Sequence, residues 1–248
     1  AYSNRILDFS KLPVVVAKDT AKAAPYIYKD FVKAPASSQY KKATGIQRVF
    51  NGSNYRKEWS TPVKLKVFNV NQEKGGFTIE GVGGGKQTRS LQLKDKQGRE
   101  WVLRTIDKDP TAAIPQNFRQ SFASNIVQDM ISAAHPYAPL AIPALADTTN
   151  VLVAAPEFFY VPDDPSLGYY KPLFANKICI LERKDPGEGA DSKSSFKLFN
   201  KMREDNDHTV DEEAVLRARL LDMLIADWDR HFDQWRWGTV DTGKGKIY

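Results

Sequence analysis

The chain has 248 residues, of which 42% are hydrophobic and 27% charged, and its formal net charge is +6. This composition is typical of a globular protein with one large domain or two small ones, and it excludes a disordered chain. No apolar run reaches the roughly 18 residues of a membrane-spanning helix, and the first residues lack the basic-then-apolar pattern of a signal peptide. The single cysteine, Cys179, excludes an internal disulfide and a multi-cysteine zinc site.

The positive charge permits contact with nucleic acid, phosphorylated ligands or anionic lipid. The basic residues are spread in modest clusters, however, which favours a solvated basic surface. Aromatic and basic residues alternate only at residues 235–237, and no nucleic-acid motif is present. We therefore expect no nucleic-acid partner.

Residues 1–60 resemble an irregular leader that holds one helix. Ser37 and Ser38 are alternative N-caps for this helix, and the Asn51–Gly52 pair is a suitable end. The next region, 61–184, is expected to hold a sheet and a helix.

Alternating apolar residues predict three strands in this region, at 64–70, 88–94 and 100–106. The last two are expected to form a hairpin, and a glycine-rich stretch precedes it. Helical spacing predicts a helix over 117–134, and the apolar run at 176–184 predicts a buried strand. We expect a small antiparallel sheet with the helix packed on it.

Residues 185–248 are expected to form part of a separate helical lobe after a polar connector. The strongest helix is predicted over 212–227, with acidic residues at its start. Its apolar residues make a broad face: Val215, Leu216, Ala218, Leu220, Leu221, Met223, Leu224 and Ile225. Trp235 and Trp237 share strand parity, so we expect both on one face, buried against this helix.

The most unusual stretch is "IADWDRHFDQWRWG" at 225–238, in which Asp227, Asp229 and Asp233 are crowded together. Several carboxylates at the end of a buried helix are costly unless they bind cations or accept hydrogen bonds. Three interpretations compete: solvated turn residues, ion pairs with Arg230 and Arg236, and a site that holds a metal or accepts a proton.

The order Asp-Arg-His followed by Phe-Asp-Gln resembles the catalytic loop of the protein-kinase-like fold, as in phosphatidylinositol kinases and HipA-type kinases. The resemblance implies that Asp229 deprotonates an acceptor hydroxyl and that Gln234 helps to hold a divalent metal. It implies ATP and Mg²⁺ as cofactors. Gln234 departs from the family, which has asparagine there, and its extra methylene displaces the metal-binding oxygen. His231 is expected to be structural.

Other elements follow in kinase-like order. The glycine-rich stretch could approach phosphates, although a flexible turn explains it equally well. The cation for the phosphates is either Arg104 or Lys108, Asp129 is the acid expected to pair with it, and strand 176–184 is the expected hinge. The nucleotide-binding candidates are thus Gly83, Gly84, Gly85, Lys86, Arg104, Lys108, Asp129 and Glu182.

One kinase element is missing, the second metal-binding aspartate. Asp241 lies in "DTGKG", which is typical of a hairpin turn. We therefore expect an α+β, protein-kinase-like fold, with a small antiparallel-sheet lobe and a helical lobe, truncated at its C-terminus.

The stretches "GGGKQTRSLQL", "WVLRTIDKDP", "QDMISAAHPYAPLAIPALAD" and "IADWDRHFDQWRW" also resemble an uncharacterised region of large Bacteroidetes envelope proteins. In those proteins the region accompanies a calcineurin-like metallophosphoesterase domain or a surface-antigen barrel domain. The resemblance implies a cell-envelope or periplasmic setting and further domains as partners.

Two functions remain open from the sequence. The first is a kinase-like nucleotide-binding domain that transfers phosphoryl groups only with a further C-terminal part. The alternative is a non-catalytic kinase-like binding or scaffold module. The two differ in whether ATP and metal bind.

Overall fold

A computed structural model describes residues 27–83, 89–109, 114, 122–185, 187, 192–227 and 230–248. The chain divides into two compact units. The first comprises Ala1–Ala138 and Pro156–Glu182, and the second comprises Pro139–Ala155 and Arg183–Tyr248. The fold is a mixed α+β fold, as the sequence predicted.

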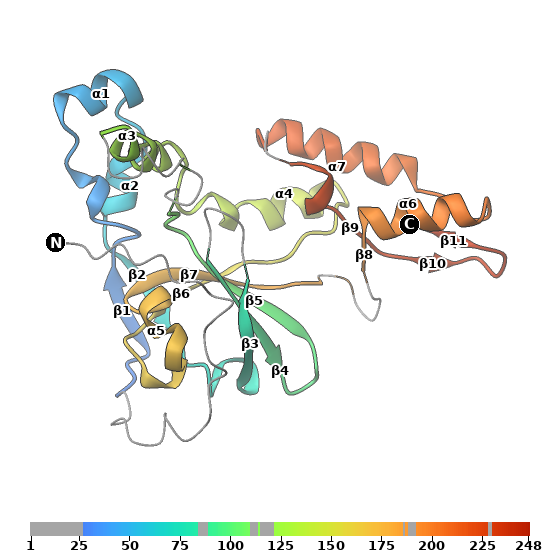
Figure 1. Ribbon diagram of the computed structural model, residues 1–248, viewed down its shortest axis with the longest axis horizontal. Coiled ribbons are helices and arrows are strands. Elements are labelled where there is room, and N and C mark those ends of the chain that lie inside the picture. Colours follow the sequence, from blue (N-terminus) through green and yellow to red (C-terminus); the bar gives the residue numbers. More distant parts are fainter. Residues whose placement is uncertain are drawn as a thin grey trace. The chain divides into compact units, whose positions relative to one another are not determined.

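The first unit is built on a seven-stranded sheet in the order β1-β2-β6-β7-β5-β4-β3 (Figure 1). Its strands are β1 (Phe31–Ala34), β2 (Val63–Val67), β3 (Phe77–Gly83), β4 (Ser90–Asp95), β5 (Glu100–Thr105), β6 (Glu157–Val161) and β7 (Lys177–Arg183). The three predicted strands correspond to β2, β4 and β5.

The expectation of a small antiparallel sheet is wrong at the β2–β6 pair. Strands β3 and β4, and β4 and β5, pair antiparallel, but β2 and β6 pair parallel. A parallel neighbour requires a long crossover. The chain makes one here, since strands β3–β5 and the helices at Phe122–Met130 and Ile142–Thr148 lie between β2 and β6.

Both faces of the sheet are buried, which explains the continuous apolar run in β7. Cys179 and Leu181 join one core cluster, which also contains Leu167 and Phe174 from the segments η9 (Pro165–Tyr170) and α5 (Lys171–Phe174). The alternate residue Ile178 joins a second cluster. Strands buried on two faces carry apolar residues at consecutive positions.

The second cluster joins the sheet to the N-terminal helices. Trp59, in α2 (Arg56–Ser60), and Tyr40, in η3 (Gln39–Lys41), pack with Ile106, Ile178 and further sheet residues. The supposed leader is therefore part of the sheet unit over its described residues. It contributes strand β1 and more than the one helix expected.

The helix expected in the leader is α1 (Gly45–Asn51). It ends at Asn51, where Gly52 adopts a φ of 76°, as the Asn–Gly pair predicted. Its N-cap is Thr44, which forms a capping box with Gln47, so the expected serine cap is wrong. Ser38 instead precedes η3 without a side-chain cap bond. The capping box satisfies helix donors reciprocally, which explains the start at Thr44.

The helix predicted over 117–134 is described as α3 (Phe122–Met130), followed by a 3-10 turn, η7 (Ile131–Ala133). Residues 115–121 lie outside the described part. Helix α3 contacts α1, and η7 contacts α2 (Figure 1). The short 3-10 helix η4 (Glu73–Gly75) lies between β2 and β3, and η8 (Ala138–Leu140) follows η7.

Over its described residues, the second unit contains helices and two small sheets. Its helices are α4 (Ile142–Thr148), α6 (Ser195–Glu204), α7 (Glu212–Leu224) and η10 (Phe232–Gln234). Its strands pair as β8 (Lys193–Ser194) with β9 (Arg236–Trp237) and β10 (Val240–Asp241) with β11 (Lys246–Ile247). Within the described residues, no helix has the length and apolarity needed to cross a membrane.

Helix α7 was predicted correctly but its burial was not. Asp211 caps it, because the Asp211 carboxylate accepts a hydrogen bond from Ala214 N at 2.9 Å. Leu221 is buried as expected. However, four other residues of the expected apolar face are exposed: Leu216, Leu220, Met223 and Leu224. Helical spacing predicts a helix but does not show which part of a broad apolar stripe is covered.

Candidate functional site

Two of the nucleotide-binding candidates of the first unit, Arg104 and Glu182, meet at neighbouring strands. Arg104 on β5 forms an ion pair with Glu182 on β7. The two strands are adjacent in the sheet, and Ile106 N donates to Ile178 O at 3.2 Å. The side chains of Arg104 and Glu182 are 45% and 23% exposed, so water and small ligands reach both groups.

Lys108 lies beyond the end of β5 and its side chain is exposed. Its carbonyl accepts a hydrogen bond from Gln128 Nε2 at 3.0 Å, which links this segment to α3. The same amide nitrogen donates to the Tyr40 hydroxyl at 2.8 Å. The backbone of Lys108 is therefore held in place while its ammonium group faces solvent.

A partly buried polar network surrounds this segment, and sequence patterns did not predict it. Asp107 accepts hydrogen bonds from the Tyr40 hydroxyl at 2.7 Å and from Gln39 Nε2 at 2.8 Å. Burial raises the pKa of Asp107, and burial together with the nearby Asp107 charge raises the pKa of Tyr40. The network fixes the end of β5 close to Arg104.

The expected pairing of Asp129 with Arg104 or Lys108 is wrong. Asp129 accepts two hydrogen bonds, each of 2.6 Å, from the guanidinium of Arg56, and a third from Asn51 Nδ2 at 2.9 Å. Arg56 and Asp129 are 7% and 5% exposed. The hydrogen bonds from Arg56 lower the pKa of Asp129. Because α2 lies beside η7, Arg56 reaches Asp129, and the pair joins the helices.

The glycine-rich stretch is described only up to Gly83, the last residue of β3, which pairs in register with Ser90. A Cβ atom at Gly83 would lie 2.8 Å from Gln92 Nε2, so a side chain here would displace Gln92. Gly84, Gly85 and Lys86 lie outside the described residues. Their approach to phosphates stays a prediction.

In the second unit, ion pairs hold the segment around the Asp-Arg-His motif. Arg230 pairs with Asp227 at 2.6 Å and with Asp222 of α7 at 3.4 Å. Asp222 also pairs with Arg219 at 2.9 Å. For Asp227, the ion-pair interpretation is therefore confirmed.

Asp229, the expected catalytic base, lies outside the described residues. His231 is the residue before η10, and both His231 and Gln234 are exposed. Asp241 accepts a hydrogen bond from Gly243 N at 2.8 Å, within the turn between β10 and β11. It lies in the hairpin turn that the sequence predicted.

Trp235 and Trp237 lie on one face, as alternation predicted, with their rings stacked at 5.7 Å. They are only half-buried. Trp237 Nε1 donates to Ser195 Oγ of α6 at 2.9 Å, while Trp235 lies 6.0 Å from the guanidinium of Arg219 of α7. The expectation that both rings are buried against α7 is therefore wrong. Strand β9 pairs with β8, which directly precedes α6, so Trp237 lies beside α6 instead.

Ser195 joins this strand to η10. It is 1% exposed, and its hydroxyl donates to the Phe232 carbonyl at 2.8 Å while it accepts from Trp237. Replacing Ser195 by alanine leaves an indole N–H and a carbonyl without this partner. We expect a loss of about 1–3 kcal/mol in the free energy of unfolding, measured by urea denaturation. Ser60→Ala is the control, because the Ser60 hydroxyl makes only an exposed hydrogen bond, to the Lys57 carbonyl at 3.3 Å. Equal losses for the two variants would contradict the anchoring role.

The described residues do not provide a metal ligand set. Among them, no group of three or more histidine, cysteine, aspartate or glutamate side chains could hold a metal ion. Mg²⁺ is normally bound by carboxylates in an octahedral arrangement. The described residues therefore do not fit Mg²⁺, and no metal-dependent step is derived from them.

The first unit offers an accessible guanidinium, Arg104, beside the carboxylate of Glu182 on the neighbouring strand. The chain leaves this unit directly after Glu182. A guanidinium can bind phosphate oxygens through two parallel hydrogen bonds. The adjacent Glu182 carboxylate competes with a phosphate for the same guanidinium. Comparisons of the chain with protein-family models, curated proteins and solved structures found no match.

Proposed function

We propose that this chain is a kinase-like nucleotide-binding domain of a larger bacterial envelope protein, in which Arg104 contacts the phosphates. In this proposal, Asp229 supports phosphoryl transfer only when further residues complete a set of metal ligands. The envelope setting rests on the sequence resemblance alone.

The observation that carries the proposal is the position of Arg104 among the elements. A glycine-containing hairpin (β3–β4) precedes β5, and α3, β6 and β7 follow it. Strand β5 lies between the hairpin and β7. The accessible cation Arg104 thus lies beside β7, and at the end of β7 the chain enters the second unit. In a kinase-like fold this is the expected place of a phosphate-binding residue near the hinge.

A non-catalytic binding module is the second candidate, and two observations favour it. Glu182 already neutralises Arg104, and Asp129 is committed to Arg56 rather than to the proposed site. Gln234 also replaces the metal-binding asparagine of the kinase-like loop. Such a module would keep the fold without phosphoryl transfer.

ATP binding to the 248-residue chain, measured by isothermal titration calorimetry with EDTA present, tests the proposal. Arg104→Gln removes a charge-assisted contact, so we expect about tenfold weaker binding. Glu182→Gln frees Arg104, so we expect binding to strengthen by a few-fold.

Arg99→Gln is the matched control, because Arg99 also pairs with a carboxylate of the sheet, Asp95, at 2.7 Å. We expect its ATP affinity to equal that of the unaltered chain. Absence of binding at ATP concentrations of about 1 mM, the upper end of ordinary KM values, would reject nucleotide binding. Binding that Arg104→Gln leaves unchanged would reject the proposed site.

A further inference from the structure

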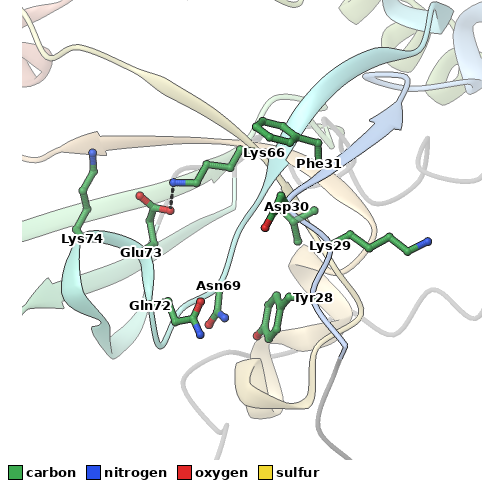
Figure 2. A pocket seen from close by; sticks show the side chains of 10 residues that line it. Tyr28, Lys29, Asp30, Phe31, Lys66, Asn69, Gln72, Glu73 and Lys74 are labelled. Atoms are coloured by element: carbon green, nitrogen blue, oxygen red, sulfur yellow. Dashed lines mark ion pairs between the residues drawn. The ribbon is translucent and has the colours of Figure 1, made fainter.

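A polar pocket of about 490 Å³ lies in the first unit, apart from the Arg104–Glu182 pair. Three segments line it: residues 28–31 before and in β1, residues 66–67 of β2, and the turn around η4 (Figure 2). Its volume falls within the roughly 300–1,000 Å³ typical of small-molecule sites. The sequence patterns did not predict it, because its walls are distant in sequence.

Structural contacts hold the wall in place. The Tyr28 hydroxyl donates to Asp164, and Asp30 accepts a hydrogen bond through its carbonyl from Val67 N at 3.0 Å. Asn69, 8% exposed, accepts a hydrogen bond from Asn71 N at 3.0 Å through Oδ1. These bonds leave the Asp30 carboxylate and the Asn69 amide nitrogen available to a ligand.

The unused polar groups converge on one opening. Figure 2 shows the Asp30 carboxylate, the Asn69 and Gln72 amides and the Tyr28 ring around it. Among the described residues, the side chains of Asp30 and Gln72 have no hydrogen-bond or ion-pair partner. The opening therefore presents a hydrogen-bond acceptor and amide donors.

The charges of the pocket disfavour a strongly charged ligand. Lys66 is paired with Glu73 at 2.8 Å, and Lys74 with Glu157 at 2.6 Å. A polyanion would face the carboxylates of Asp30 and Glu73, while a polycation would face the three lysines of the lining, Lys29, Lys66 and Lys74. Hydroxyl groups both donate and accept hydrogen bonds, so a neutral polyhydroxylated ligand satisfies both kinds of wall group.

We propose that this pocket binds a neutral sugar. The Asp30 carboxylate and the Asn69 and Gln72 amides bind its hydroxyl groups. Such a site is independent of the nucleotide site proposed above.

Saturation-transfer difference NMR on the 248-residue chain tests this assignment with glucose, galactose, mannose and N-acetylglucosamine. Glucosamine and glucuronate serve as cationic and anionic comparators. We expect at least one neutral sugar to bind with a Kd of about 10 mM or lower, and more tightly than both comparators. No binding by the neutral sugars, or stronger binding of a charged comparator, would overturn the proposal.

Asp30→Asn and Gln72→Ala locate the site, since both residues are exposed and their replacement is compatible with folding. Each change is expected to weaken the sugar's binding by about tenfold, because one hydrogen bond to the ligand is lost. Asp147→Asn, an exposed change in α4, is the control and should bind like the unaltered chain. Equal affinity in all three variants would place the sugar elsewhere and refute the assignment.

Discussion

Asp129→Asn is expected to lower the free energy of unfolding by about 3–5 kcal/mol, because it leaves the buried Arg56 guanidinium without its counter-charge. Both side chains are almost fully buried, and two hydrogen bonds of 2.6 Å join them. Urea denaturation followed by circular dichroism measures the change. A loss below about 1 kcal/mol would mean that water or another group solvates Arg56.

Two controls separate this effect from a general effect of charge. Glu204→Gln breaks a solvent-exposed ion pair with Lys201, so this variant should be as stable as the unaltered chain. The double change Arg56→Met with Asp129→Leu replaces the buried pair by apolar groups. It should recover much of the lost stability, because neither charge is left buried alone.

The Arg56–Asp129 pair makes a pH-dependent contribution to the free energy of unfolding. Its hydrogen bonds to Arg56 lower the pKa of Asp129 in the folded protein below the value of about 3.9 for an unfolded aspartate. The stabilisation is therefore present above pH about 3.9 and is lost as pH falls through the lowered folded-state pKa. The stability difference between the unaltered chain and Asp129→Asn should shrink over that range and stay constant between pH 5 and pH 7.

Trp59→Ala is expected to cost about 3–5 kcal/mol, the second large effect, since it empties the centre of the cluster between the sheet and the N-terminal helices. Trp59 is 2% exposed, and its ring meets Tyr40 edge-on at 5.1 Å. Its Nε1 donates to Ala134 O at 2.8 Å. Trp59→Phe should cost less, because it keeps part of the ring contacts.

Trp237→Ala is the matched control, because it removes the same side chain from a half-buried position. Its cost should be about half that of Trp59→Ala, in proportion to the smaller area that it removes from water. From the sequence alone, both Trp235 and Trp237 were expected to be buried, so that replacing either by alanine would cost as much as at a core position. Equal losses of unfolding free energy in Trp59→Ala and Trp237→Ala would show that the buried area of these tryptophans does not determine their contribution to stability.

Local signals determined several elements of this protein. Alternation and the turn between Asp95 and Arg99 predicted the β4–β5 hairpin, and Asp95 Oδ1 accepts hydrogen bonds from Gln97 N and Arg99 N, both at 2.9 Å. Asp211 starts α7, and Gly52 ends α1. In each case the decisive hydrogen bond or backbone conformation involves residues a few positions apart, so it can be read from the sequence.

Only the tertiary structure decided which distant groups meet. Asp129 pairs with Arg56, 73 positions away, although Arg104 and Lys108 were the expected cations. The parallel β2–β6 pair, the exposed stripe of α7 and the pocket beside Asp30 depend in the same way on how distant segments pack. Apolar periodicity shows that a face is available for burial, but many partners can cover the same face. Partner choice is set by the combined packing of the chain, which no local pattern contains.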